Sequence, residues 1–212
     1  MKYIAHRGIY NKKYKENTKE EIINTLSIKE ISGVEFDIRK TLDNKFILYH
    51  DMLIKIKNKY EKVSNTTLKN IKEEYNITTL EELLNNINTN KILLIEIKEE
   101  TNNFDVTIDK LLKILKKYKS LNIYLCSFNY NLIKKIKINS KYKCGLIVGY
   151  LQNITKISNF FDFYLYSYNN INLINYSKKI FIFTINSKQK LNSIKIKNEY
   201  YIISDNIKLF IN

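Results

Sequence analysis

The chain has 212 residues, of which 44% are hydrophobic, and it carries a formal net charge of +15. This apolar content is enough for a complete hydrophobic core, and no Pro-rich or Gly/Ser-rich stretch marks a linker, so we expect one domain over residues 1–212. An apolar run of about 18 residues is absent, and the segment before His6 leaves no room for a signal peptide. We therefore expect a cytoplasmic protein.

The positive charge would ordinarily indicate a nucleic acid or an anionic membrane as partner. Lysines are spread along the chain without a dense basic block, and Lys, Asn, Ile and Tyr dominate while Pro and Trp are absent. This pattern is typical of composition drift on a solvated surface. We expect no nucleic-acid partner, and contact of a basic face with a membrane surface stays open.

Short apolar runs alternate with helical patterns along the chain. Strands are expected at residues 3–5, 33–39, 91–98, 122–127, 144–148, 161–166, 180–185 and 201–204. Helices are expected after caps at Asn17 or Thr18, Thr66 or Thr67, and Thr79, over 106–118, 131–138, 154–159, 170–176 and 188–194, and from 206. Eight strands alternating with helices predict an α/β fold, a single (β/α)8 TIM barrel. A doubly wound open sheet is the alternative, disfavoured because no Gly-rich phosphate loop follows the first strand.

A β-hairpin excursion is expected after the second strand. A tight turn centred on Asp43-Asn44 would pair residues whose numbers sum to about 87, which places His50 across from Asp37. Glu35 and Asp37, two residues apart on one strand, point to the same face. The hairpin thus brings two carboxylates and an imidazole together, which favours a catalytic or metal site.

Catalytic groups of such barrels lie at the carboxyl ends of the strands. Three carboxylates without nearby thiols suit a hard cation such as Mg²⁺ or Ca²⁺. Cys126 and Cys144 have no ligand spacing and are interpreted as buried structural residues. The expected strand ends carry His6 and Arg7 on the first strand, Glu35 and Asp37 on the second, and Glu96 and Lys98 on the third.

Five short motifs, in this order and at these spacings, resemble the glycerophosphodiester phosphodiesterases, a family of phospholipase C-like TIM-barrel phosphodiesterases. The motifs are His6-Arg7-Gly8, Glu16-Asn17-Thr18, Glu35-Phe36-Asp37, His50-Asp51 and Glu96-Ile97-Lys98. Weaker landmarks are Ser127-Phe128-Asn129, Phe183-Thr184-Ile185-Asn186 and Ile203-Ser204-Asp205. The chain departs from the family at Lys15, Phe183 and Ser204, where Pro, Trp and Thr are usual. The segment between His50 and Glu96 is short, so we expect no large inserted domain.

The resemblance implies metal-dependent hydrolysis of a glycerophosphodiester to sn-glycerol 3-phosphate and an alcohol. It assigns the Mg²⁺ or Ca²⁺ ion to Glu35, Asp37 and Glu96, the substrate phosphate to Arg7 and Lys98, and general acid/base catalysis to His6 and His50, with Glu16, Asn17 and Asp51 supporting them. Which histidine is the acid is left open.

Two alternatives remain. One is a phospholipase D-like activity on lysophospholipids or sphingomyelin, with an apolar entrance contributed by Phe128 and Phe183. The other is a non-catalytic basic module that binds nucleic acid or anionic lipid.

Overall fold

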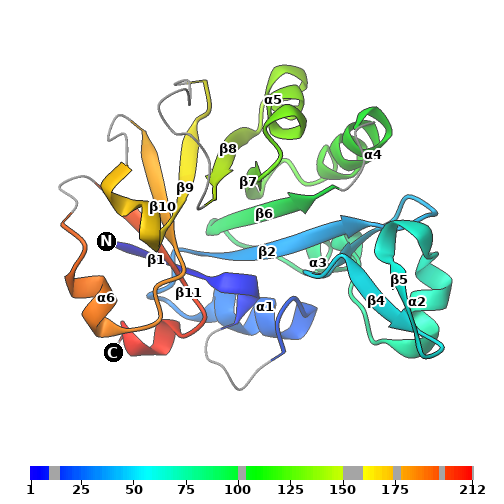
Figure 1. The fold of residues 1–212 in the computed structure, drawn as a ribbon, viewed down its shortest axis with the longest axis horizontal. Helices are drawn as coiled ribbons and strands as arrows, with labels where there is room; N and C mark the ends of the chain where they lie inside the picture. Colours follow the sequence, from blue (N-terminus) through cyan, green and yellow to red (C-terminus); the bar gives the residue numbers. More distant parts are fainter. Residues whose placement is uncertain (10–14, 100–103, 150–159, 174–177, 196–198, 212) are drawn as a thin grey trace.

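The computed structural model describes residues 1–9, 15–99, 104–149, 160–173, 178–195 and 199–211. Eight parallel strands form a closed ring, because β1 pairs with both β11 and β2. These strands are β1 (Lys2–Ala5), β2 (Gly33–Lys40), β6 (Ile92–Lys98), β7 (Asn122–Ser127), β8 (Lys143–Val148), β9 (Phe163–Ser167), β10 (Lys179–Phe183) and β11 (Tyr200–Ser204). The expected (β/α)8 barrel is confirmed (Figure 1).

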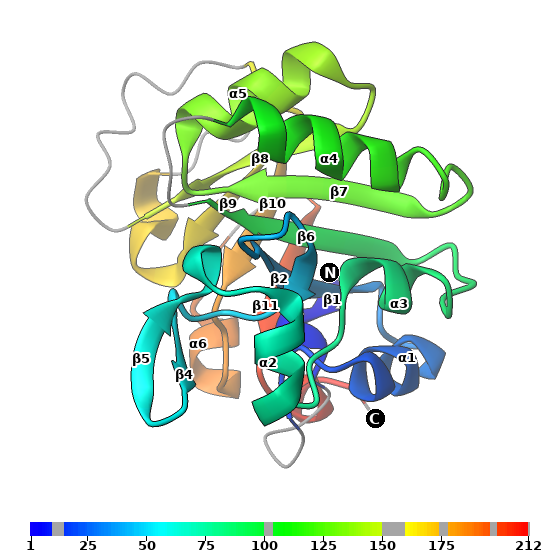
Figure 2. The ribbon, with the colours of Figure 1, turned by 90° about the vertical axis from the view of Figure 1, so that its right-hand side faces the viewer.

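Helices lie between the strands of the barrel. The α-helices of the barrel are α1 (Lys19–Ser27), α4 (Asp105–Leu115), α5 (Tyr130–Asn139) and α6 (Lys188–Asn192). Asn129 and Ser187 cap α5 and α6 by accepting a backbone N–H three residues on. Figure 2 shows α4 and α5 lying over the outer face of β7 and β8. Two expected helices are short 3₁₀ segments instead, η4 (Tyr168–Leu173) and η5 (Ile207–Leu209), and the expected helix over 154–159 lies outside the described residues.

Alternation along each strand divides the core into two parts. On β2, Val34, Phe36 and Ile38 are fully buried against the helices. On β6, Leu94 faces inward, in a cluster that fills the barrel with residues such as Phe163. Because Glu35 is in register with Leu94, the carboxylates of β2 share this inward face. The strand pattern therefore directs acidic groups into the ring and apolar groups toward the helices.

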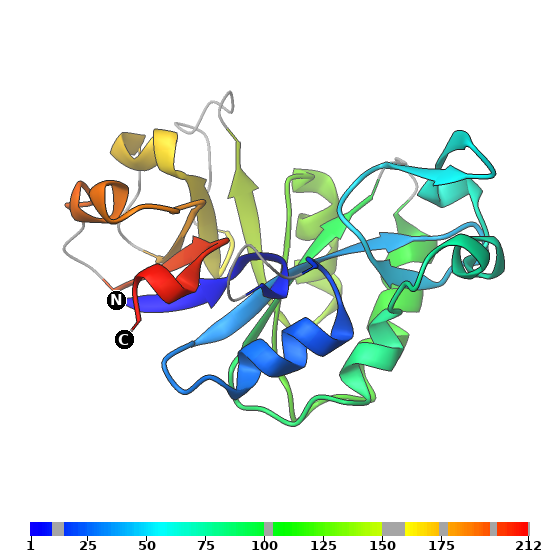
Figure 3. The same ribbon diagram turned by 90° about the horizontal axis from the view of Figure 1, so that it is seen from below.

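The chain between β2 and β6 forms an excursion on one side of the barrel (Figures 1 and 3). β3 (Phe46–Leu48) pairs antiparallel with β2 outside the ring. It is followed by a two-stranded sheet that the sequence did not lead us to expect, β4 (Leu53–Ile56) with β5 (Lys59–Lys62). The remaining elements are η1 (His6–Gly8) after β1, and η2 (Val63–Asn65), α2 (Leu68–Glu74) and α3 (Leu80–Leu84) of the excursion.

The predicted register of the hairpin is wrong by one residue. Lys40 pairs with Phe46, so the residue numbers sum to 86 and Asp37 lies across from Tyr49, not from His50. The cause is the turn, which has three residues between Thr41 and Lys45 and places Asn44 in the left-handed region at φ 58°. A three-residue loop with a left-handed last residue is a common hairpin connection, and it moves His50 beyond the end of β3.

Candidate active site

Three carboxylates meet inside the barrel, near the carboxyl ends of β2 and β6. Asp37 and Glu96 are partners in the register of these two strands, and Glu35 precedes Asp37 on the same face. One oxygen from each of the three lies within 4.8 Å of the others. The site that the sequence predicts from spacing is therefore one spatial cluster.

Burial and mutual repulsion both act against the ionised forms of these carboxyl groups. Burial first, and then the charge of Asp37, raises the pKa of Glu35 to about 8. The same two causes raise the pKa of Glu96. Lys98 lies 2.7 Å from Glu96 Oε1 and 3.2 Å from Asp37 Oδ1 and balances part of the charge. An all-oxygen donor set of carboxyl groups that repel one another when ionised fits a hard divalent cation, so these residues suit Mg²⁺ or Ca²⁺.

The loop after β1 holds the cluster from one side. The Arg7 backbone N–H donates to Glu35 Oε2 at 2.9 Å, and the Arg7 guanidinium lies 3.6 Å from Asp37 Oδ2. Arg7 Nη1 donates to both oxygens of Glu16, at 2.7 and 2.8 Å. Asn17 donates to Asp37 Oδ2 at 2.9 Å and accepts the Asp37 N–H at 3.0 Å. Glu16 and Asn17 therefore brace Arg7 and Asp37.

His6 has a partner to which the sequence analysis assigned no role. Its Nδ1 lies 2.5 Å from Asp205 Oδ1, at the end of β11, and its Nε2 lies 3.8 Å from Glu35. Burial acts to lower the pKa of His6, but Asp205 and Glu35 outweigh it and raise that pKa. Asn186 donates to the other Asp205 oxygen at 2.6 Å. The signal was available, because Asp205 follows the last barrel strand just as His6 follows the first.

His50 reaches the site on the chain that leaves β3. Its Nδ1 lies 2.7 Å from Asp51 Oδ1, and its backbone carbonyl accepts from Arg39 Nε at 2.9 Å. The hydrogen bond to His50 is the largest cause of a lowered pKa at Asp51. A carboxylate on Nδ1 fixes which ring nitrogen is presented to the site. Arg39, near the end of β2, thus anchors the His50 backbone.

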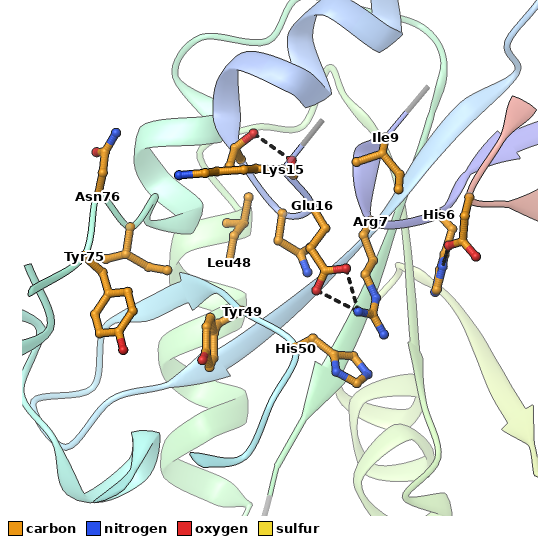
Figure 4. A pocket seen from close by; sticks show the side chains of 14 residues that line it. His6, Arg7, Ile9, Lys15, Glu16, Leu48, Tyr49, His50, Tyr75 and Asn76 are labelled. Carbon is orange, nitrogen blue, oxygen red and sulfur yellow. Dashed lines mark hydrogen bonds and ion pairs between the residues drawn. The ribbon is translucent and has the colours of Figure 1, made fainter. Parts of the chain in front are cut away.

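Two cavities meet at His6, Arg7 and His50. The smaller cavity, of about 220 Å³, is lined by Glu35 and Glu96 of the carboxylate cluster and, on another side, by apolar side chains. The larger, of about 700 Å³, runs from His6 toward the excursion, with Tyr49 and Tyr75 at its far end (Figure 4). The smaller cavity is also lined by Glu35, Glu96, Lys98, Phe128, Ile147, Leu165, Phe183, Thr184 and Ile203.

The predicted site residues are brought together in this region. Eight of the ten, Asn17 among them, line one cavity or the other. The other two line neither cavity: Asp37 is only 1% exposed, and Asp51 is exposed and contacts His50. Within the described residues no helix is long and apolar enough to cross a membrane.

Comparisons with known proteins agree with this geometry. The model of the glycerophosphoryl diester phosphodiesterase family matches residues 6–158. A glycerophosphodiester phosphodiesterase from Thermotoga maritima is 27% identical, with a TM-score of 0.78 over 98% of this chain and 96% of that chain. A phosphodiesterase from Oleispira antarctica, solved in complex with the product sn-glycerol-3-phosphate, is 20% identical, with a TM-score of 0.80 over 97% and 93%. A comparison with curated protein sequences gave no significant match.

The family match covers most of the chain, and it includes every sequence motif that carries a predicted site residue. The solved structures share the closed barrel over nearly their whole length. Sequence, fold and site geometry thus lead to one conclusion: the chain belongs to the glycerophosphoryl diester phosphodiesterase family.

Proposed function

We propose that this enzyme hydrolyses glycerophosphodiesters to sn-glycerol 3-phosphate and an alcohol, with a divalent cation and two histidines. The observation that carries the proposal is the cavity on which Glu35, Glu96, His6 and His50 converge with two cationic side chains. Support comes from the Oleispira antarctica phosphodiesterase of the same fold, which was solved with sn-glycerol-3-phosphate as product.

Glu35, Asp37 and Glu96 would hold the Mg²⁺ or Ca²⁺ ion. A bound divalent cation supplies charge that neutralises phosphoryl oxygens. Arg7 and Lys98 supply further positive charge beside the reacting phosphorus, where charge builds up in the pentavalent state. The Arg7 guanidinium and the Lys98 ammonium group already pair with carboxylates of the site. Both side chains are therefore held in place before the substrate arrives.

His6 and His50 are proposed as the acid/base pair. One takes the proton of the attacking oxygen, from water or from the neighbouring glycerol hydroxyl, and the other protonates the departing alcohol oxygen. Each has a carboxylate on Nδ1, Asp205 for His6 and Asp51 for His50, so each would present Nε2 to the substrate. This arrangement suits proton transfer near neutral pH.

The metal is tested by chelation. Hydrolysis of glycerophosphocholine or glycerophosphoethanolamine, followed by phosphorus NMR, should stop in EDTA and return with Mg²⁺ or Ca²⁺. Glu96→Gln should weaken metal binding, read by titration calorimetry, while the protein stays folded. The same spectra show whether a cyclic phosphate accumulates. Full activity in EDTA would rule out the proposed cation.

The histidines are tested with two leaving groups. Protonation by a general acid speeds the departure of an alkoxide leaving group greatly, but that of p-nitrophenolate only a little. The Ala variant of the acid should therefore lose about 10²–10⁴-fold on the natural diester and much less on a nitrophenyl ester, whereas the variant of the base should lose on both. Equal small losses for His6→Ala and His50→Ala on both substrates would overturn the proton-transfer roles.

A phospholipase D-like activity on lysophospholipids is the second candidate. Phe128 is 44% exposed and packs edge-on against Phe183, with ring centroids 6.3 Å apart, on the wall of the smaller cavity. These rings offer an apolar surface at the mouth of the site. Lysophosphatidylcholine belongs in the same substrate panel, and release of choline from it would favour this candidate.

A further inference from the structure

The two cavities share the residues that would handle the phosphate, and each cavity continues away from them in its own direction. A phosphodiester has the same form, with two alcohol arms on one phosphorus. We propose that the larger cavity holds the departing alcohol and that the rings of Tyr49 and Tyr75 in it select an alcohol that carries a quaternary ammonium group, of which choline is the simplest. This inference rests on the proposed function of the site.

The residues that line each cavity indicate which alcohol of the phosphodiester it would hold. The smaller cavity contains Glu35, Glu96 and Lys98, which suit the glycerol hydroxyls and the phosphate retained in the product. The larger cavity has none of the three clustered carboxylates among its described lining residues. Its walls beyond the phosphate-handling residues include Leu48 and Ile77, so an alcohol placed there meets apolar surface. We call the part between His50 and Tyr75 the tyrosine groove.

The two tyrosines are fixed by their hydroxyl groups. Tyr75 donates to the backbone carbonyl of Lys55 at 2.8 Å, and the Tyr49 hydroxyl lies 3.5 Å from the carbonyl of Leu53, both on β4. With the polar ends engaged, the rings themselves remain for contact with a ligand. Figure 4 shows both rings at the end of the cavity opposite His6, with His50 between. A quaternary ammonium group is attracted to aromatic ring faces, so the fixed rings of the tyrosine groove suit choline.

Charges along the tyrosine groove also bear on a cationic alcohol. The positive charge of Arg7 is matched by Glu16, and His50 lies against Asp51. Lys15, an exposed side chain, also lines the cavity. A cationic alcohol would be repelled by Lys15, so removing this charge should favour choline, whereas a neutral polyol would not respond.

The test compares two substrates in each variant. The ratio of kcat/KM for glycerophosphocholine to that for glycerophosphoglycerol removes effects common to both. Tyr75→Leu and Tyr49→Leu should each lower the ratio about 2- to 30-fold, as expected for a lost cation–π contact. Tyr75→Phe keeps the ring and should keep most of the ratio. Tyr60→Leu, on an exposed tyrosine of β5 outside the groove, is the matched control. Lys15→Gln, at an exposed position, should raise the ratio.

A binding measurement separates this inference from the proposed function. Saturation transferred from the protein to the choline methyl protons in NMR should be strong for the wild type and for Tyr75→Phe and weak for Tyr75→Leu. If the wild type hydrolyses no glycerophosphodiester but shows this dependence, the proposed function is wrong and the tyrosine groove is a choline site. Unchanged ratios and unchanged saturation in both Leu variants, or a lower ratio in Lys15→Gln, would overturn the inference.

Discussion

Removing the Glu35 carboxylate should stabilise the metal-free protein at alkaline pH. Burial and the charge of Asp37 raise the pKa of Glu35 from 4.5 to about 8, so between these values the folded state holds a proton that the unfolded state releases. The free energy of unfolding therefore falls as the pH rises through this window. At 1.36 kcal/mol per pKa unit the full fall is roughly 4–5 kcal/mol, a large share of the ~5–15 kcal/mol that stabilises a typical domain.

Urea denaturation in EDTA at pH 4.5, 7 and 9 measures this effect. Glu35→Gln should be more stable than the wild type by a few kcal/mol at pH 9, and the two should converge toward pH 4.5. Glu73→Gln, an exposed position on α2, serves as the control. Mg²⁺ should stabilise the wild type more than Glu35→Gln, because only the wild type has all three proposed carboxylate ligands. If the free energies of unfolding of wild type and Glu35→Gln differ by the same amount at every pH, burial and the charge of Asp37 do not raise the pKa of Glu35 as described.

Two further predictions concern the groups that hold the site. Asp205→Asn should lower the pKa of His6, because it removes a carboxylate that raises this pKa. The limb of the pH profile of kcat/KM that reports His6 should then move to lower pH. An unchanged pH profile would show that Asp205 does not act on the proposed proton transfer. Asn17→Ala removes both hydrogen bonds to the buried Asp37. It should lower the free energy of unfolding in urea by on the order of 1–3 kcal/mol and should weaken metal binding. A loss of metal binding alone would mean that the two hydrogen bonds position Asp37 without stabilising the fold.

The barrel and the cluster of three carboxylates were predictable because they depend on periodic signals. The two-residue spacing of Glu35 and Asp37 fixes their common face whatever the details of the fold, and Glu96 is the one acidic residue within an otherwise apolar run of the third strand. Alternation of strands and helices then places these residues at one end of the ring. Each step uses a local pattern that tertiary contacts reinforce.

Features set by turn conformation and by distant contacts were not predictable in this way. The register of β3 depends on whether the turn holds two or three residues, and both are compatible with Asp43-Asn44. The β4–β5 hairpin carries Lys57 and Asn58 with positive φ, in a sequence without glycine. The pair of His6 and Asp205 joins residues 199 positions apart, so no local pattern marks it, and only the predicted closure of the barrel places the ends of the first and last strands together.

The position of β3 outside the ring has a consequence for how activity can be lost. The eight strands of the ring close without β3, and His50 follows β3 along the chain. Three register pairs join β3 to β2, and the Arg39 hydrogen bond holds the His50 backbone just beyond. Opening of this short ladder would withdraw one imidazole while every strand pair of the barrel stays intact. Amide hydrogen exchange should accordingly report faster opening around Tyr49 than around Leu94. If His50 transfers a proton as proposed, loss of catalysis should precede unfolding on heating.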